Sequence, residues 1–529
     1  MKLLSIKDLS LKIGETKILR DVDLHMNAGE VVAITGESGS GKSMTALSVM
    51  GLLPQAAKAA GQITLDGVDI LNASEPELCD MRGNTMGMVF QEPMTALNPV
   101  QTIGAQVAET ILIHERISKR AAHTRAAAML QRVGLTLSPD RYPHELSGGQ
   151  RQRVVIAMAI VRQPTLLIAD EPTTALDVTT QAQILDLLRD LVRELDMGLL
   201  IITHDLAVVA DIADHIVVMQ QGRVVEAAPT AHLLANMQHP YTKALFAAST
   251  HQPPVPDPRQ TQIAPMSGLS VQKVVRTYPM KRAKLLGPRP QFRALNDVSF
   301  TINRGERVGL VGESGCGKST LTRAILGLDK VQGGTITLDG DPVYANRSSN
   351  FAVRSKMQVV FQDPYGSFNP RHKVRRLVSE PWHLLEEPPK DQVGLIAQAL
   401  EDVGLAATDA DKYIHEFSGG QRQRIAIARA LIVKPELIIF DEAVSALDVS
   451  VRAQVLDLIA DISARRDLSF LFISHDLTVV RSVTDRILVM KEGEIVEQGD
   501  TETVFTAPRH AYTKALLAAA PQLPDLQEA

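Results

Sequence analysis

The chain has 529 residues, a length that predicts two to four domains rather than one core. Hydrophobic residues make up 45% and charged residues 22%, as in folded soluble proteins, and the net charge of −5 disfavours a broad nucleic-acid-binding surface. Two cysteines, Cys79 and Cys316, exclude a disulfide framework and a cysteine-rich metal site. The start, MKLLSIKDLSLKIGE, lacks an apolar signal region, and no stretch approaches the roughly 20 apolar residues of a membrane helix. We therefore expect a cytosolic chain, unless a partner carries it to a membrane.

Short apolar runs alternate with helical patterns through the first 250 residues. VVAIT precedes Gly36, LLIAD ends at Asp170 and LLIIT precedes His204, while the helical pattern TTQAQILDLLRDLVREL lies between the last two. Continuous apolar strands that alternate with helices are typical of a parallel sheet covered on both faces. The more polar and helical segment from Gln91 to Ser147 predicts an inserted helical subdomain.

A glycine-rich loop follows the first of these strands. GESGSGKS, residues 36–43, fits G-x-x-x-x-G-K-[ST] between an apolar strand and the helical pattern MTALSVMGLL. The glycines let backbone N–H groups surround phosphates at a helix N-terminus. Lys42 would contact the β- and γ-phosphates, and Ser43 would bind Mg²⁺. A chance glycine-rich turn is the alternative, and a second copy further along the chain disfavours it.

Four further polar residues lie at the ends of strands of the same predicted sheet. Asp170 and Glu171 end LLIADE at the carboxyl edge of a strand, where parallel sheets bind ligands. Asp170 can hold Mg²⁺, and Glu171 can orient and polarise a water molecule. His204 closes the next strand and can contact a γ-phosphate. Gln91, which follows the apolar pair VF, can reach Mg²⁺ or the water.

The same motifs recur in the second half of the chain. Gln91 returns as Gln362, Ser147 as Ser418, Glu171 as Glu442 and His204 as His475, each 271 residues later (362 − 91). Lys42 returns as Lys318 in the loop GESGCGKS, residues 312–319, and Asp170 as Asp441. The polar, proline-rich HQPPVPDPRQTQIAP between the copies predicts a linker. We expect domains at 1–250 and 268–529, joined by a linker at 251–267.

Each half also contains a nearly identical dodecamer. YPHELSGGQRQR starts at Tyr142 and YIHEFSGGQRQR starts at Tyr413. Phosphate loop, glutamine, SGGQ, strand-Asp-Glu and strand-His occur twice in that order, and together they resemble the ATP-binding cassette of ABC transporters over nearly the whole chain. The resemblance implies two P-loop ATPase domains of the α/β class, each a RecA-like parallel-sheet core with an antiparallel β subdomain and an inserted helical subdomain.

The resemblance also implies how the dodecamers act. In this family two cassettes pack head to tail, so Ser147–Gln150 would complete the ATP site of Lys318 and Ser418–Gln421 that of Lys42. A serine hydroxyl and glycine N–H groups at a helix start are suited to hold a γ-phosphate. The chain is accordingly expected to be an ATPase that uses ATP and Mg²⁺.

The motifs and the resemblance together predict three sets of site residues. The catalytic residues are Glu171, His204, Glu442 and His475. The nucleotide-binding residues are Gly36, Ser38, Gly39, Gly41, Lys42, Ser43, Met44, Gln91, Ser147, Gly148, Gly149, Gln150, Tyr278, Gly312, Ser314, Gly315, Gly317, Lys318, Ser319, Thr320, Gln362, Ser418, Gly419, Gly420 and Gln421. The Mg²⁺ ligands are Ser43, Gln91, Asp170, Ser319, Gln362 and Asp441.

Two further repeats indicate the kind of transporter. QEPMTALNP and QDPYGSFNP extend the two glutamine segments, and HPYTKALFAA and HAYTKALLAA, starting at His239 and His510, close the two halves. These are similar to the ATPase subunits of dipeptide and oligopeptide importers, and the fusion resembles the Yej type linked with peptide and microcin uptake. The resemblance implies two separate membrane permeases, a periplasmic peptide-binding protein, no nucleic acid, and a peripheral place on the cytoplasmic face of the bacterial inner membrane.

Three alternatives fit less well. A tandem-cassette ATPase acting on ribosomes would have a long charged linker, and a DNA-repair cassette ATPase would have zinc-binding cysteine clusters. A fused sugar-importer ATPase usually has one degenerate site, whereas both sites here keep their lysine, carboxylates and histidine.

Two positions differ between the halves. An aromatic residue stacks on adenine in the family, and alignment places Ile13 opposite Tyr278, although Phe292 beyond an insertion could also supply the ring. Stacking would make the second site the tighter one. Cys316 replaces Ser40 in a phosphate loop, where a helix start can lower a thiol pKa. We expect either a reactive thiol or a small residue that only fills the loop.

Overall fold

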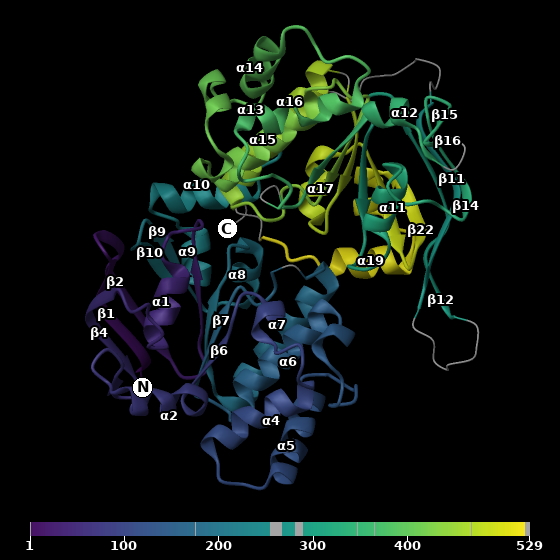
Figure 1. Ribbon diagram of the computed structural model, residues 1–529. Coiled ribbons are helices and arrows are strands. Elements are labelled where there is room, and N and C mark those ends of the chain that lie inside the picture. Colours follow the sequence, from purple (N-terminus) through teal and green to yellow (C-terminus); the bar gives the residue numbers. More distant parts are fainter. Residues whose placement is uncertain are drawn as a thin grey trace. The chain divides into compact units, whose positions relative to one another are not determined.

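The computed structural model describes residues 2–174, 176–253, 267–280, 289–345, 348–363, 366–466 and 468–523. These residues form two compact units, one made mainly of Met1–Thr250 and the other mainly of His251–Leu447 and Val451–Ala520. Each unit contains an antiparallel sheet and a largely parallel sheet with helices around them (Figure 1). Most of the expected linker, residues 254–266, lies outside the described part of the chain.

The first unit is built on two sheets. Its antiparallel sheet has the order β2 (Thr16–Asn27), β1 (Lys2–Ile13), β4 (Ala57–Leu65) and β5 (Val68–Asp69). Its main sheet has the order β10 (Arg223–Pro229), β9 (His215–Gln220), β3 (Val31–Thr35), β8 (Gly198–Ile202), β7 (Leu166–Asp170) and β6 (Met86–Val89). All neighbours in the main sheet are parallel except β10, which runs antiparallel to β9.

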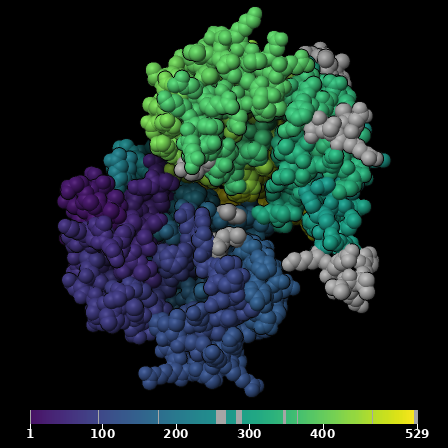
Figure 2. Space-filling view, viewed as in Figure 1, coloured from purple at the N-terminus to yellow at the C-terminus, as the bar shows by residue number. Residues whose placement is uncertain are grey.

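Helices surround this sheet and form the insertion. They are α1 (Lys42–Val49), α2 (Glu75–Asn84), α3 (Pro93–Ala96), α4 (Ile103–His114), α5 (Lys119–Arg132), the 3₁₀ turn η1 (Pro143–Glu145), α6 (Gly148–Ile160), α7 (Val178–Leu195), α8 (Leu206–Ile212), α9 (Thr230–Ala235) and α10 (Pro240–Ser249). Between Gln91 and Ser147 the chain forms α3, α4, α5 and η1, which is the predicted helical insertion. The insertion gathers at one end of the unit (Figure 2).

The side chains of the central strand β3 point alternately to the two faces of the sheet, and both faces are buried. Ala33 packs in a core with residues of the helices α4 and α6, such as Ile103 and Val154. Val32 and Ile34 point to the other face and pack with residues of the antiparallel sheet. Because side chains alternate along a strand, a run such as VVAIT supplies two cores at once.

The second unit repeats this arrangement. Its antiparallel sheet has the order β12 (Gln291–Asn303), β11 (Ser267–Pro279), β14 (Gly333–Leu338) and β15 (Asp341–Pro342). Its main sheet has the order β18 (Met357–Phe361), β19 (Leu437–Asp441), β20 (Ser469–Ile473), β13 (Arg307–Val311), β21 (Arg486–Lys491) and β22 (Glu494–Asp500). A short pair, β16 (Tyr344–Ala345) and β17 (Ser348–Ser349), follows the first sheet.

The helices of the second unit follow an order similar to that of the first, with two additional 3₁₀ turns in the described part of the insertion. They are α11 (Lys318–Ile325), α12 (Phe351–Ser355), α13 (Val374–Val378), η2 (Glu380–Leu384), α14 (Gln392–Asp402), η3 (Ala407–Asp411), η4 (Ile414–Glu416), α15 (Gly419–Leu431), α16 (Val449–Arg466), α17 (Leu477–Val483), α18 (Thr501–Thr506) and α19 (Ala511–Ala518). The predicted fold class, with a parallel-sheet core, an antiparallel β subdomain and a helical insertion in each half, is confirmed. None of the helices in the described ranges is long and apolar enough to cross a membrane.

Candidate active site

Each phosphate loop joins the central strand of its main sheet to the following helix. In the first unit β3 ends at Thr35 and α1 begins at Lys42. Gly36 has φ +143°, and a Cβ there would lie 2.1 Å from the backbone oxygen of Met219 on β9. Gly312 repeats this with φ +152° and a Cβ position 2.1 Å from the oxygen of Met490 on β21. Both backbone angle and space therefore require glycine where the loop leaves the strand.

The loop lysines are buried inside the loops that they belong to. Lys42 Nζ donates to the backbone oxygens of Gly36 and Glu37 at 2.8 and 2.9 Å, and only 7% of Lys42 is exposed. Lys318 Nζ does the same with Gly312 at 2.6 Å and Glu313 at 3.0 Å. Burial lowers the pKa of the Lys42 ammonium. Buried ammonium groups bonded to neutral carbonyls favour an anionic ligand, which fits a phosphate group.

The acidic pair lies at the carboxyl end of β7 in the first unit and of β19 in the second, as predicted. Burial raises the pKa of Asp170, while a hydrogen bond from the Ser43 hydroxyl opposes the shift. In the second unit burial and the charge of Glu442 raise the pKa of Asp441 to about 6. A buried carboxylate beside a loop serine is a suitable partial ligand set for Mg²⁺, which usually takes its other oxygens from phosphates and water. Asp170 with Ser43 therefore fits this ion.

Both glutamates adopt a backbone conformation that is unusual for residues with a side chain. Glu171 has φ +48° and Glu442 has φ +51°. Conformations of this kind cost about 1–3 kcal/mol and concentrate at functional sites. Positive φ also recurs at other equivalent positions of the two units, such as Gln163 and Lys434, so this backbone conformation is a shared feature of the repeated fold.

Three side chains hold Glu171 in the first unit. Gln91 Nε2 donates to Glu171 Oε2 at 2.7 Å, Thr174 Oγ1 donates to the same oxygen at 2.8 Å, and His204 Nδ1 lies 3.2 Å from Glu171 Oε1. Burial opposes ionisation, but the hydrogen bonds and the charge of His204 outweigh it and lower the pKa of Glu171 to about 2. The residues predicted to act on water thus form one cluster with an ionised carboxylate.

The second unit has a looser version of this cluster. His475 Nδ1 lies 3.5 Å from Glu442 Oε2, and this hydrogen bond is the main reason why the pKa of Glu442 is lowered. Gln362 Nε2 instead donates to Ser445 Oγ at 3.2 Å. The two predicted glutamines therefore have different partners, although the sequence motifs around them are alike.

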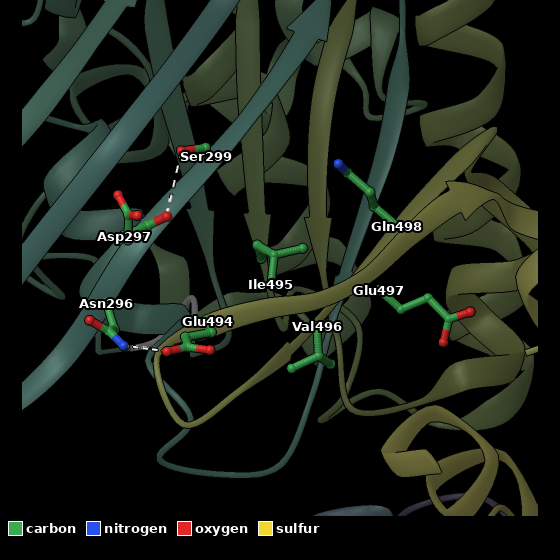
Figure 3. A pocket seen from close by; sticks show the side chains of 8 residues that line it. All are labelled: Asn296, Asp297, Ser299, Glu494, Ile495, Val496, Glu497 and Gln498. Atoms are coloured by element: carbon green, nitrogen blue, oxygen red, sulfur yellow. Dashed lines mark hydrogen bonds between the residues drawn. The ribbon is translucent and has the colours of Figure 1, made fainter. Parts of the chain in front are cut away.

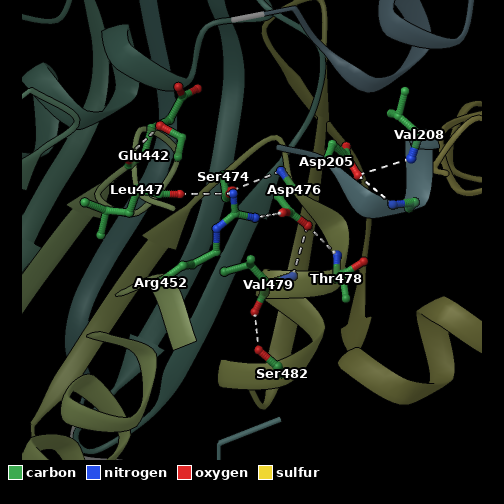
Figure 4. Close-up of polar contacts among 12 residues, drawn as sticks. Asp205, Val208, Glu442, Leu447, Arg452, Ser474, Asp476, Thr478, Val479 and Ser482 are labelled. Atoms are coloured by element: carbon green, nitrogen blue, oxygen red, sulfur yellow. Dashed lines mark hydrogen bonds and ion pairs between the residues drawn. The ribbon is translucent and has the colours of Figure 1, made fainter. Parts of the chain in front are cut away.

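An arginine network beside Glu442 was not predicted from the sequence (Figure 4). Arg452 donates to Asp476 Oδ2 at 2.8 Å and to the backbone oxygen of Leu447 at 3.5 Å. Asp476 follows His475 and caps α17. The network therefore connects the segment that follows His475 to α16. The aspartate that follows the histidine in both THD and SHD is the sequence feature that could have indicated this contact. Its counterpart in the first unit is a bond from Gln181 to Asp205 at 3.2 Å.

The SGGQ segments begin helices α6 and α15. Ser147 and Ser418 are the N-caps, and each accepts a hydrogen bond from the backbone of the glutamine three residues later. A Cβ at Gly149 would lie 2.2 Å from Thr180 Cγ2, and one at Gly420 would lie 2.2 Å from Val451 Cγ1.

Packing does not explain the first glycine of each SGGQ segment. A Cβ at Gly148 would lie 3.6 Å from a Leu176 methyl, which is ordinary contact, and one at Gly419 would meet nothing within 4 Å among the described residues. These positions are open to the close approach of a ligand.

A cavity of about 430 Å³ lies beside the second phosphate loop. Its lining comprises Phe292, Arg293, Ala294, the loop residues Glu313–Cys316, and Lys491–Gly493. The size is within the range of small-ligand sites. Phe292 is 51% exposed and lies on this cavity. Its register partner across the sheet is Tyr278.

Tyr278 has other contacts within its unit. Its hydroxyl donates to Asp329 Oδ2 at 3.1 Å, and the guanidinium of Arg276 lies 4.6 Å from its ring centre. The adenine-stacking role of Tyr278 stays a prediction, and the cavity lining favours the alternative ring of Phe292.

The expectation of a low-pKa thiol at Cys316 is wrong. Cys316 is 8% exposed, and burial raises the pKa of its thiol despite the attraction of Lys318. The hydroxyl of Ser40 at the same place is buried without a hydrogen-bond partner among the described residues. Both loops therefore contain a small, buried side chain at this position. The effect of desolvation on the pKa of the Cys316 thiol outweighs that of the helix N-terminus.

A second cavity, of about 620 Å³, lies between β12 and β22 (Figure 3). Its lining contains no residue of the phosphate loop. Its glutamates already have partners: Glu494 accepts from Asn296, and Glu497 accepts from the backbone N–H groups of Arg509 and His510. We assign this cavity no ligand.

Comparison with known proteins identifies the family. The model of a family described as "ABC transporter" matches residues 19–174 and 295–445, and that of "Oligopeptide/dipeptide transporter, C-terminal region" matches residues 225–271 and 496–528. The chain is 44% identical to the uncharacterised ABC transporter ATP-binding protein YejF of Escherichia coli (strain K12), with 98% of this chain and 99% of that protein covered.

Two further relatives are equally similar. The chain is 44% identical to the peptidoglycan transport ATP-binding protein YejF of Agrobacterium fabrum, with 98% and 96% covered. It is also 44% identical to the glutathione import ATP-binding protein GsiA of Escherichia coli O157:H7, with 95% and 86% covered. With two matched cassettes and relatives of this similarity along almost all of its length, the chain belongs to the ABC transporter family and is an ATP-binding ATPase.

Proposed function

We propose that this chain is the ATP-hydrolysing subunit of an importer for short peptides. The observation that carries the proposal is the duplication: each half has its own loop lysine, acidic pair and histidine, and each half ends in the C-terminal region of oligopeptide and dipeptide transporters. Both halves are therefore proposed to hydrolyse ATP. The proposed domains are 1–250 and 268–529, with residues 251–267 as the linker.

Each half contributes the same chemistry to its site. In the first half, Lys42 and the loop amides bind the phosphates. Ser43, Asp170 and Gln91 are proposed to hold Mg²⁺, which neutralises charge on the phosphate oxygens. Glu171, ionised at neutral pH, accepts a hydrogen bond from the attacking water and then its proton. His204 orients this carboxylate and is proposed to contact the γ-phosphate.

The sites are proposed to be shared between the halves. Ser418–Gln421 would complete the site of Lys42, and Ser147–Gln150 would complete that of Lys318. The open space at Gly419 supports a ligand at the segment. We expect Ser418→Arg to reduce photo-crosslinking of an ATP analogue to the first half and to leave the fold of the second half intact. Loss of crosslinking in the second half alone would contradict the head-to-tail arrangement.

The names of the relatives support the proposed substrate and partners. Their names refer to glutathione and peptidoglycan, and the C-terminal family model refers to oligopeptides and dipeptides. We propose that ATP binding and hydrolysis shift two separate membrane permeases between two conformations, that a periplasmic peptide-binding protein delivers the peptide, and that this chain binds the permeases on the cytoplasmic face of the inner membrane.

Hydrolysis and transport can be tested together. The double variant Glu171→Gln, Glu442→Gln should bind ATP as the wild type does but release phosphate at least about 10²-fold more slowly, because the group that accepts the proton is lost. Uptake of a labelled tripeptide by cells that express the permeases should fall in parallel. Normal phosphate release by the double variant would refute the assigned role of the glutamates, and normal hydrolysis without peptide uptake would refute the substrate class.

A further inference from the structure

The C-terminal segment of each half is hydrogen bonded to the phosphate loop of the same half. Tyr241, at the start of α10, accepts a hydrogen bond through its hydroxyl from the backbone N–H of Glu37 at 3.0 Å. Tyr512, at the start of α19, accepts the equivalent bond from Glu313 at 3.0 Å. Neither tyrosine is among the residues that the motifs assign to the site, and the sequence repeat HPYT and HAYT contains both.

The peptide group that the tyrosine holds is also the one that holds the lysine. The peptide between Gly36 and Glu37 offers its N–H to Tyr241 and its carbonyl to Lys42 Nζ, at 2.8 Å. A rotation of this peptide would move the carbonyl away from the ammonium. The peptide between Gly312 and Glu313 is held in the same way. Hydrogen bonds that meet at one peptide group strengthen each other, so the tyrosine and the lysine are coupled.

The tyrosine is itself held firmly. In the first unit His239 accepts the backbone N–H of Tyr241 at 3.2 Å, and Glu226 on β10 accepts the N–H groups of Gln238 and His239 at 2.7 and 3.0 Å. Phe246, on the same helix, is 1% exposed in the core. The hydroxyl is thus anchored to the edge strand and to the core, and it can fix the loop.

The second unit repeats these anchors. His510 accepts the N–H of Tyr512 at 3.2 Å, and Glu497 on β22 accepts the N–H groups of Arg509 and His510 at 2.7 and 3.0 Å. Tyr512 is 7% exposed. The recurrence of these hydrogen bonds in both halves argues against an accidental bond.

We propose that Tyr241 and Tyr512 are positioning residues, which orient the phosphate-loop lysine of their own half through one peptide group. The C-terminal segment of each cassette thereby sets the affinity of the ATP site in that cassette. This inference rests on the ATP sites of the proposed function. It adds that removal of one hydroxyl weakens binding at the lysine of the same half.

Two variants of the full chain allow the Kd of each ATP site to be measured separately. Lys318→Ala removes ATP binding at the second site and leaves the site of Lys42. Lys42→Ala removes binding at the first site and leaves the site of Lys318. In the first background Tyr241→Phe should raise the Kd for ATP about three- to tenfold, the range expected for one neutral hydrogen bond. In the second background Tyr512→Phe should do the same. Competition against a fluorescent ATP analogue measures both values.

A matched control and a second ligand separate positioning from a general loss of structure. Tyr344, in the second unit, donates its hydroxyl to the backbone oxygen of Asp329, outside the phosphate loop. In the Lys42→Ala background Tyr344→Phe should leave the Kd for ATP unchanged. AMP lacks the phosphates that the lysine contacts, so the Kd for AMP should not change in Tyr512→Phe.

The outcomes are distinguishable. Weaker ATP binding with unchanged AMP binding supports the positioning role. An unchanged Kd for ATP in both tyrosine variants, or an equal loss for ATP and AMP, overturns it. A wild-type chain that binds no ATP would instead refute the ATP sites themselves. Melting temperatures without nucleotide confirm that the compared variants are folded.

Discussion

Replacing Asp441 by asparagine should stabilise the second half of the nucleotide-free protein at neutral pH. Burial and the neighbouring charge of Glu442 raise the pKa of Asp441 from 3.8 to about 6. Above that pH the carboxylate is ionised in a place that disfavours its charge. The same charge is what a bound cation would require, so we expect a site that sacrifices stability for binding.

The sign and the size follow from linkage between proton binding and folding. A carboxyl group whose pKa is higher in the folded state adds stability below the unfolded-state value of 3.8, and this stability is lost as the pH rises through about 6. At about 1.36 kcal/mol per pKa unit, the shift corresponds to roughly 3 kcal/mol, fully lost above about pH 7. Asp441→Asn carries no charge and avoids this loss.

The single tryptophan provides an assay for this half alone. Trp382 is the only tryptophan of the chain, lies in the second unit and is 7% exposed, so its fluorescence reports on the unfolding of that unit. With an m-value of about 3 kcal/mol/M, the midpoint of urea unfolding at pH 8 should rise by about 1 M in Asp441→Asn. At pH 4 the wild type and the variant should nearly coincide.

Asp170→Asn is the matched control, because Asp170 occupies the equivalent place in the first unit and should leave the Trp382 transition unchanged. A midpoint at pH 8 that is equal to or below that of the wild type in Asp441→Asn would refute the reasoning. So would a gain of the same size at pH 4 and pH 8, since the effect would then not depend on ionisation. Addition of Mg²⁺ and ATP should stabilise the wild type more than Asp441→Asn.

Three further predictions concern the loops around the sites. Gly420→Ala should lower the melting temperature at a cost of about 1–3 kcal/mol, because its methyl group would overlap Val451. Gly419→Ala should leave the melting temperature unchanged, because its Cβ would meet no described atom within 4 Å. Equal melting temperatures of the two variants would contradict the packing argument. Iodoacetamide at pH 8 should label the exposed Cys79 well before the buried Cys316, as peptide mass spectrometry can measure; the reverse order would be inconsistent with the burial of the thiol. Phe292→Ala should raise the Kd of the second site for ATP severalfold, because the stacking of the ring on adenine is lost. An unchanged Kd would favour Tyr278 as the stacking residue.

The sequence was sufficient to predict the sheet edges where the candidate site residues gather. Lys42 and His204 follow short apolar runs and Asp170 ends one, and these runs form the buried strands β3, β8 and β7. The carboxyl ends of parallel strands meet at one edge, so these positions had to converge. The constant spacing of the second copy then predicted the same edge in the other half.

The partners of these residues could not be predicted in the same way. Gln91 donates to Glu171, while its repeat Gln362 donates to a serine, although both follow the pair VF. A hydrogen bond depends on side-chain directions to within an ångström, and motif spacing does not carry that information. The alignment also favoured Tyr278 as the residue that stacks on adenine. The cavity beside the second phosphate loop is instead lined by Phe292, which pairs with Tyr278 across the two strands.

By itself, the sequence determined the two cassettes, their phosphate loops and the family, because these depend on local patterns that each repeat contains in full. Only the tertiary structure decided the pKa shifts of the ionisable side chains and the hydrogen-bond partners of the site residues. Cys316 has a raised rather than a lowered pKa, and Asp441 titrates at about 6, because burial is a sum over segments far apart in the chain. The bond from Glu37 to Tyr241 spans 204 residues, and no local pattern could have joined them.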